Sequence, residues 1–90
     1  MEVREMQAYI SIINESAYPA ISVLFDDIIL FKDILHTSAK KPYPAGSVQV
    51  IVLDNRQRTM HDLYIGLSPD KSYILTVHTK DCILIQSGFP

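Results

Sequence analysis

The chain has 90 residues, of which 48% are hydrophobic and 20% are charged, and its formal net charge is −2. This length is typical of one domain, here residues 1–90, and the hydrophobic content is enough for a folded core rather than a disordered chain. A net charge near zero excludes the broad positive field that non-specific nucleic-acid binding needs, so a nucleotide or nucleic acid is a less favoured partner than a protein.

The cysteine content and the absence of long apolar runs predict a cytoplasmic protein. Cys82 is the one cysteine of the chain, so no disulfide can form within it. Secreted domains of this size usually depend on disulfides. Residues 1–6 contain no apolar run of signal-peptide length, and no stretch is apolar for long enough to form a transmembrane helix. We therefore expect no contact with a membrane.

The apolar residues near the N-terminus are spaced as in an amphipathic helix. From Val3 they recur at Met6, Ile10, Ile13 and Ala17, which lie on one face at about 100° per residue. The isoleucines of residues 8–13 also favour a strand. The helical spacing makes a first helix the main prediction.

A second helix is predicted over residues 19–38. Pro19 suits the first turn of a helix. Seven apolar residues then keep helical spacing: Ile21, Leu24, Phe25, Ile28, Phe31, Ile34 and Leu35. The alternative is a hairpin over residues 20–32 that turns at Asp26 and Asp27. This pair lacks the glycine that tight hairpin turns prefer, so the helix is favoured.

The second half of the chain is predicted to be a sheet. Residues 40–46 (KKPYPAG) contain two prolines and a glycine, which are expected to stop any regular element. Strands follow at residues 47–54, 63–67, 73–78 and 82–86, where β-branched and other apolar residues are frequent. Their short connections favour antiparallel neighbours, so we expect one four-stranded meander.

The predicted fold class is therefore α+β, with two N-terminal amphipathic helices packed on a four-stranded antiparallel meander sheet. The alternative is an N-terminal helix plus a small β-barrel, in which residues 20–32 form a hairpin.

No group of residues predicts catalysis or metal binding. Cys82, His78 and Asp81 come nearest to a thiol nucleophile with its base, but Cys82 opens an apolar strand, where a buried cysteine is more common. A zinc site from these residues and His61 lacks the paired cysteines that structural zinc requires. The sequence thus predicts no enzyme, no catalytic residue, no metal and no cofactor.

The residues predicted to contact a partner or an anion are basic. Arg56, Arg58 and His61 lie in the segment that joins two predicted strands, and guanidinium groups offer paired donors to phosphate or carboxylate. Lys40 and Lys41 join this patch if the fold brings them near. These residues support an alternative function, a module that binds a small anion, a nucleotide or a nucleic acid.

The predicted strands at residues 47–53 and 82–85 are apolar on both faces. The predicted helices cover one face of the sheet, so a second copy, another protein or closure of the sheet into a barrel must cover the other. The sequence therefore predicts a small non-enzymatic protein-interaction module of the inhibitor, immunity or adaptor type. A homo-oligomer, preferably a dimer, or another protein is the expected partner.

Overall fold

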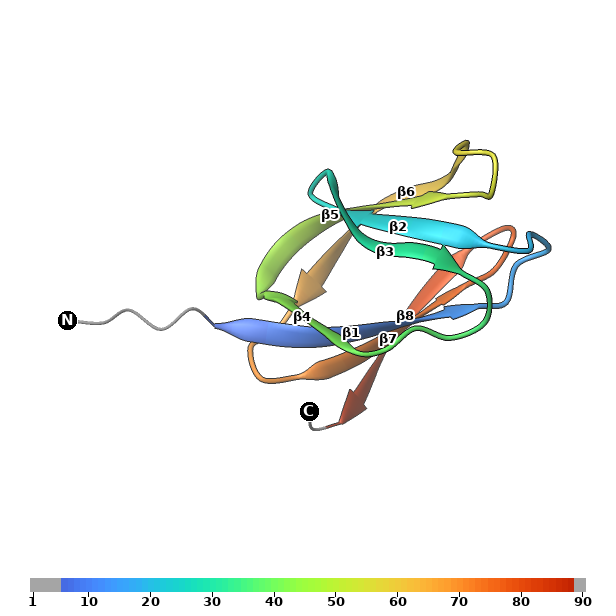
Figure 1. The fold of residues 1–90 in the computed structure, drawn as a ribbon. Coiled ribbons are helices and arrows are strands. Elements are labelled where there is room, and N and C mark those ends of the chain that lie inside the picture. Colours follow the sequence, from blue (N-terminus) through green and yellow to red (C-terminus); the bar gives the residue numbers. More distant parts are fainter. Residues whose placement is uncertain (1–5, 89–90) are drawn as a thin grey trace.

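A computed structural model of the protein describes residues 6–88, and these residues form eight strands and no helix (Figure 1). The strands are β1 (Gln7–Asn14), β2 (Ile21–Phe25), β3 (Ile28–Ile34), β4 (Lys41–Pro44), β5 (Gly46–Leu53), β6 (Thr59–Leu67), β7 (Ser72–Val77) and β8 (Cys82–Gly88). Within these residues there is accordingly no helix long and apolar enough to cross a membrane. The predicted α+β class is wrong, and so is the N-terminal helix of its alternative.

The strands form two four-stranded sheets that pack face to face (Figure 1). Sheet A has the order β4-β1-β7-β8, and sheet B has the order β3-β2-β5-β6. The β1–β7 pair is parallel, and the other pairs are antiparallel. The inward side chains of both sheets form one core of fully or nearly buried residues, among them Ile10, Ile12, Val23, Phe25, Phe31, Val50, Val52, Leu75 and Val77.

Strand β1 occupies most of the predicted first helix. Ala8, Ile10 and Ile12 are fully buried and point into the core, whereas Ile13 is half-buried on the outer face. Because a strand with apolar residues on both faces also places some of them at helical spacing, the pattern misled the prediction. Val3, the predicted helix start, lies outside the described residues.

The hairpin β2–β3 replaces the predicted second helix. Asp26 and Asp27 form its turn with positive φ angles of 49° and 67°, as a two-residue type I′ turn requires. Tertiary hydrogen bonds hold this turn without a glycine. The Asp26 N–H donates to the Gln49 carbonyl at 2.9 Å, the Asp26 Oδ1 accepts the Gln49 N–H at 3.1 Å, and the Asp26 Oδ2 accepts the Tyr43 hydroxyl at 3.0 Å.

The segment expected to stop regular structure contains strand β4, which pairs with the first half of β1 at one edge of sheet A. Pro42 lies opposite Tyr9, and Pro44 lies opposite Gln7. Proline cannot donate a main-chain hydrogen bond, so an edge strand is the place in a sheet that tolerates it.

The last four strands overlap the predicted ranges, although β6 begins at Thr59 rather than at residue 63, so that His61 lies in a strand and not in the connecting segment; the single meander is wrong. Strand β5 pairs with β6 in sheet B, and β7 pairs with β8 in sheet A. The connection at residues 68–71 carries the chain from one sheet to the other. The inner face of each sheet is therefore covered by the other sheet, not by helices.

Candidate functional site

The turn between β5 and β6 carries two of the predicted contact residues, Arg56 and Arg58, both exposed. It is held by the buried Asp54, whose Oδ1 accepts the N–H of Arg56 at 2.8 Å and the N–H of Arg58 at 3.0 Å. These donors, chiefly the Arg58 N–H, hold the pKa of the Asp54 carboxyl below its ordinary value. The turn therefore presents two guanidinium groups from a well-defined backbone.

His61, the third predicted contact residue, joins the two sheets. It is half-buried on β6, and its Nε2 lies 2.7 Å from the His78 carbonyl oxygen at the β7–β8 turn. Since a carbonyl only accepts, Nε2 carries the proton in this bond. The ring is thus engaged in the fold of this end of the molecule.

Lys41 begins β4, the edge strand of sheet A, and Lys40 directly precedes it, whereas the arginines lie in the β5–β6 turn of sheet B (Figure 1). The Lys40 Nζ donates to the Ser72 hydroxyl at 3.3 Å. The Lys41 Nζ donates to the Leu30 carbonyl at 2.7 Å and lies 5.3 Å from the centre of the Phe31 ring. The structure therefore does not gather the predicted basic residues into one patch.

The cysteine lies in an environment that suppresses thiolate chemistry. Cys82 is half-buried at the start of β8. Burial is the larger cause and the negative charge of Asp81 is the smaller cause that together raise the pKa of its thiol to about 11. At neutral pH the group is a protonated, weakly nucleophilic thiol. Among the residues that the structure describes, no group of three or more His, Cys, Asp or Glu is placed to hold a metal ion.

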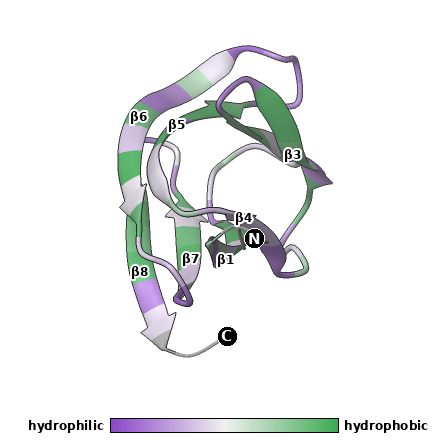
Figure 2. Cartoon of the chain, turned by 90° about the vertical axis from the view of Figure 1, so that its left-hand side faces the viewer, coloured by the Kyte–Doolittle hydropathy of each residue, from purple (hydrophilic) through white to green (hydrophobic). Residues whose placement is uncertain are grey.

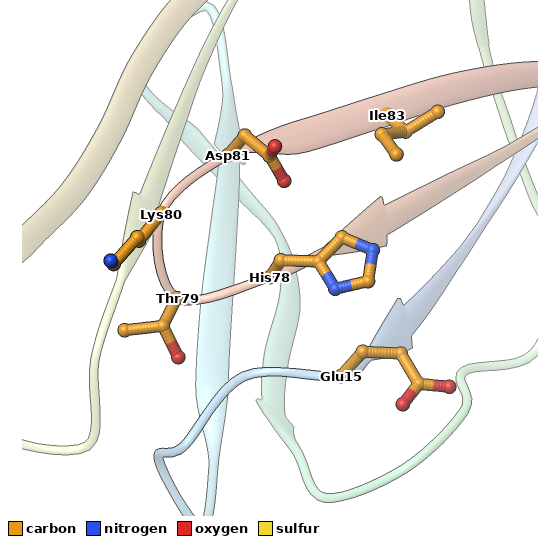
Figure 3. Close-up of a pocket in the computed structure, with 6 residues that line it drawn as sticks. All are labelled: Glu15, His78, Thr79, Lys80, Asp81 and Ile83. Carbon is orange, nitrogen blue, oxygen red and sulfur yellow. The ribbon is translucent and has the colours of Figure 1, made fainter.

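An open depression of about 520 Å³ adjoins the β7–β8 turn (Figure 3). Its lining comprises Glu15, His78, Thr79, Lys80, Asp81 and Ile83. In Figure 3, the His78 ring and the Glu15 carboxylate extend toward the same side of the turn, and the Lys80 side chain extends toward the opposite side. Small-molecule sites usually enclose most of their ligand's surface, which this depression does not do.

Strand β8 differs from the other three edge strands of the two sheets. Edge strands expose unpaired main-chain groups, and proteins usually protect them with proline, charge or bulges. Strand β4 carries two prolines, β3 carries Lys32, Asp33 and two register shifts, and β6 carries Asp62. Strand β8, CILIQSG, has neither a charge nor a proline, although one register shift lies near its end.

An exposed apolar surface continues from the β8 edge onto the outer face of sheet A. Ile83 is 46% exposed and Ile85 is 53% exposed. Ile85 lies opposite Ile74 of β7, and Ile74 lies opposite Ser11 of β1. Figure 2 shows β8 hydrophobic over most of its length, in contrast to the mixed pattern of β6.

The direction of the main-chain groups on β8 follows from two hydrogen bonds. The His78 N–H donates to the Asp81 carbonyl at 2.8 Å, and the Glu15 N–H donates to the Val77 carbonyl at 2.8 Å. Bonding directions alternate along antiparallel strands, so residues 83 and 85 bond toward β7. The N–H and C=O groups of Cys82, Leu84 and Gln86 therefore point to the outer edge of β8, which no other strand among residues 6–88 pairs with and which we call the free edge.

The sequence signal for this site was a charge-free run of seven residues, 82–88. Residues 82–85 within this run were predicted to be apolar on both faces, but their place at the end of a sheet was not predicted. In the structure, the two faces of β8 have different surroundings. Leu84 points inward and packs partly against the core, whereas Ile83 and Ile85 remain exposed outside.

Comparison with known proteins identifies the fold. No protein-family model and no curated relative matches the chain. Among solved structures, it is similar to the N-terminal domain of AlgF from P. aeruginosa, with a TM-score of 0.69 and 20% sequence identity, over 99% of this chain and 100% of that one. At this identity, the likeness concerns the arrangement of strands alone.

Proposed function

We propose that this chain is a non-enzymatic protein-interaction module, of the adaptor or inhibitor type, that binds an extended protein segment by adding it to sheet A at strand β8. The observation that carries the proposal is the free edge of β8, which has no charge and no proline and adjoins the exposed Ile83 and Ile85. Strand addition is a common way for sheet proteins to bind peptides.

The chemistry of the binding follows from the geometry of the edge. The main-chain groups of Cys82, Leu84 and Gln86 supply donors and acceptors to an incoming strand. Ile83 and Ile85 lie on the outer face of sheet A, and Leu84 lies on its inner face. A bound segment with alternating or continuous apolar residues buries these side chains, and the hydrophobic effect adds to the main-chain bonds.

Other features favour binding over catalysis. The thiol of Cys82 has a pKa of about 11, and the depression near His78 is open and lined by groups of both charges. Such a depression lacks the excluded water and aligned groups on which enzymes depend.

Site-specific crosslinking in the cell that makes the protein tests this function. A photoreactive benzophenone amino acid replaces Ile85 in one variant and Ile29 in the control. Ile29 is an isoleucine of the edge strand β3 with a similar exposed fraction, 55%. We expect a discrete protein adduct from position 85 and none from position 29. The absence of an adduct at 85, or equal adducts at both positions, contradicts the proposal.

The anion-binding alternative rests on one observation. The backbone of the β5–β6 turn is fixed by Asp54, and the turn exposes Arg56 and Arg58 together. Two guanidinium groups on a fixed turn suit a phosphate or carboxylate group. The lysines at β4 do not belong to this site.

A further inference from the structure

We infer that the strand added at β8 is the β8 of a second copy, which makes the protein a two-fold dimer with one continuous eight-stranded sheet. This inference rests on the proposed function and names its partner. Two-fold interfaces place the same surface on both subunits, so they require a self-complementary strand. The β8 strand has this property in its main chain, its side chains and its charge.

The main-chain groups set the register of the dimer. The residues that face the free edge, Cys82, Leu84 and Gln86, are centred on Leu84. An antiparallel pair with its two-fold axis at this residue bonds Leu84 to the second copy's Leu84. It also bonds Cys82 to the second copy's Gln86 and Gln86 to the second copy's Cys82. Such a pair forms about six main-chain hydrogen bonds.

The side chains fit the same register. Ile83 lies opposite the second copy's Ile85, and the two-fold axis repeats this pair. Both residues lie on the outer face, at non-hydrogen-bonded positions, where opposite side chains approach most closely. The pairing thus joins the exposed isoleucines of both copies into one row next to Ile74. On the inner face, the half-buried Leu84 gains the second copy's Leu84 as a neighbour.

Charge, bulges and prolines together favour a second copy on β8 over the edges β3 and β4. Residues 82–88 carry no charge, and Asp81 falls opposite the second copy's Ser87 in this register. On β3, the bulged edge and the adjacent Lys32 and Asp33 interrupt regular pairing. The prolines of β4 remove donors.

The size of the contact predicts a weak dimer. A strand-to-strand contact of this length buries less than the roughly 1,200 Å² at the lower limit of stable standard interfaces. We therefore expect a micromolar dissociation constant and a monomer–dimer equilibrium that depends on protein concentration.

Sedimentation equilibrium from about 5 μM to 1 mM tests the dimer with three proteins: the wild type, Ile85→Lys and Ile29→Lys. We expect the wild-type mass to rise from 10.2 kDa toward twice that value. Ile85→Lys places a lysine opposite Ile83 at both ends of the pair, so its dissociation constant should rise at least tenfold. Ile29→Lys should behave as the wild type. A wild type that stays monomeric at 1 mM, or a dimer that Ile29→Lys weakens and Ile85→Lys does not, overturns the inference.

Hydrogen exchange of the unmodified protein gives a second measurement that needs no variant. The amides of Cys82 and Leu84 point to the free edge, so their exchange should slow as the protein concentration rises. The amides of Ile83 and Ile85, which bond toward β7, should change less. Exchange at Leu84 that is independent of concentration, while the mass doubles, places the dimer elsewhere and overturns the inference.

The outcomes separate this inference from the proposed function. A monomeric wild type whose position 85 crosslinks to a different protein in the cell overturns the dimer and retains the strand-addition function. A monomer without any adduct at position 85 overturns both. A concentration-dependent dimer with a self-adduct at position 85 supports both.

Discussion

Glycine substitutions at the two aspartates of the β2–β3 turn should have opposite effects on stability. Asp27 has a φ of 67° and an exposed side chain. Glycine adopts this conformation without the penalty of a Cβ, although it also gains freedom in the unfolded chain. We expect Asp27→Gly to raise the free energy of unfolding by about 0.5 kcal/mol, which for a domain of this size is roughly 2–4 °C in Tm.

Asp26→Gly gains the same backbone freedom but loses two side-chain hydrogen bonds. The Asp26 carboxylate accepts the Tyr43 hydroxyl at 3.0 Å and the Gln49 N–H at 3.1 Å. Each bond contributes about 1 kcal/mol net at this exposed position. The free energy of unfolding should therefore fall by about 1–1.5 kcal/mol, so that the two variants differ by about 2 kcal/mol.

Urea unfolding followed by circular dichroism measures both variants, provided that their m-values match that of the wild type. The predicted second helix makes a different forecast. Glycine at either position inside a helix lowers stability by similar amounts. Equal destabilisation by Asp26→Gly and Asp27→Gly would therefore refute the type I′ turn and the role assigned to the Asp26 carboxylate.

Three further predictions follow from the site residues. The pKa of Asp54 is lowered in the folded protein, so its contribution to the free energy of unfolding is present above about pH 3.8 and is lost as the pH falls through the lower folded value. Asp54→Ala should therefore reduce the loss of stability at acid pH, as measured by urea unfolding at each pH. With its pKa near 11 against an ordinary 9.0, Cys82 should alkylate about 100-fold more slowly at pH 8 than in the unfolded chain, and equal rates would contradict its burial. If the anion-binding alternative holds, replacing Arg56 and Arg58 by alanine should weaken heparin binding about tenfold at low salt; unchanged binding eliminates it.

The candidate site could be predicted from the sequence only in part. The apolar, charge-free run around Leu84 is visible in the sequence, and it led to the expectation of association. Its position at the end of sheet A is not visible, because strand order depends on pairing between distant segments. For the basic residues, the sequence suggested a shared site that the fold does not form. Lys40 and Arg56 were predicted to share a patch if the fold brought them together, but Lys40 lies next to β4 of sheet A and Arg56 lies in the β5–β6 turn of sheet B.

Local sequence patterns were sufficient to place the strands of the second half, because β-branched residues such as Val50 and Val52 occur there in short runs between turn residues. They could not decide between helix and strand for residues 7–34, since strands that are apolar on both faces also contain residues at helical spacing. The turn at Asp26 depends on Tyr43 and Gln49, which follow it by many residues.

The parallel pairing of β1 with β7, which joins Ile10 to Tyr73, likewise depends on contacts between distant segments. Composition and periodicity thus determined where apolar strands could form. Only the tertiary structure decided which strands pair, which faces are covered and which edge remains free, because these properties come from long-range hydrogen bonds and packing.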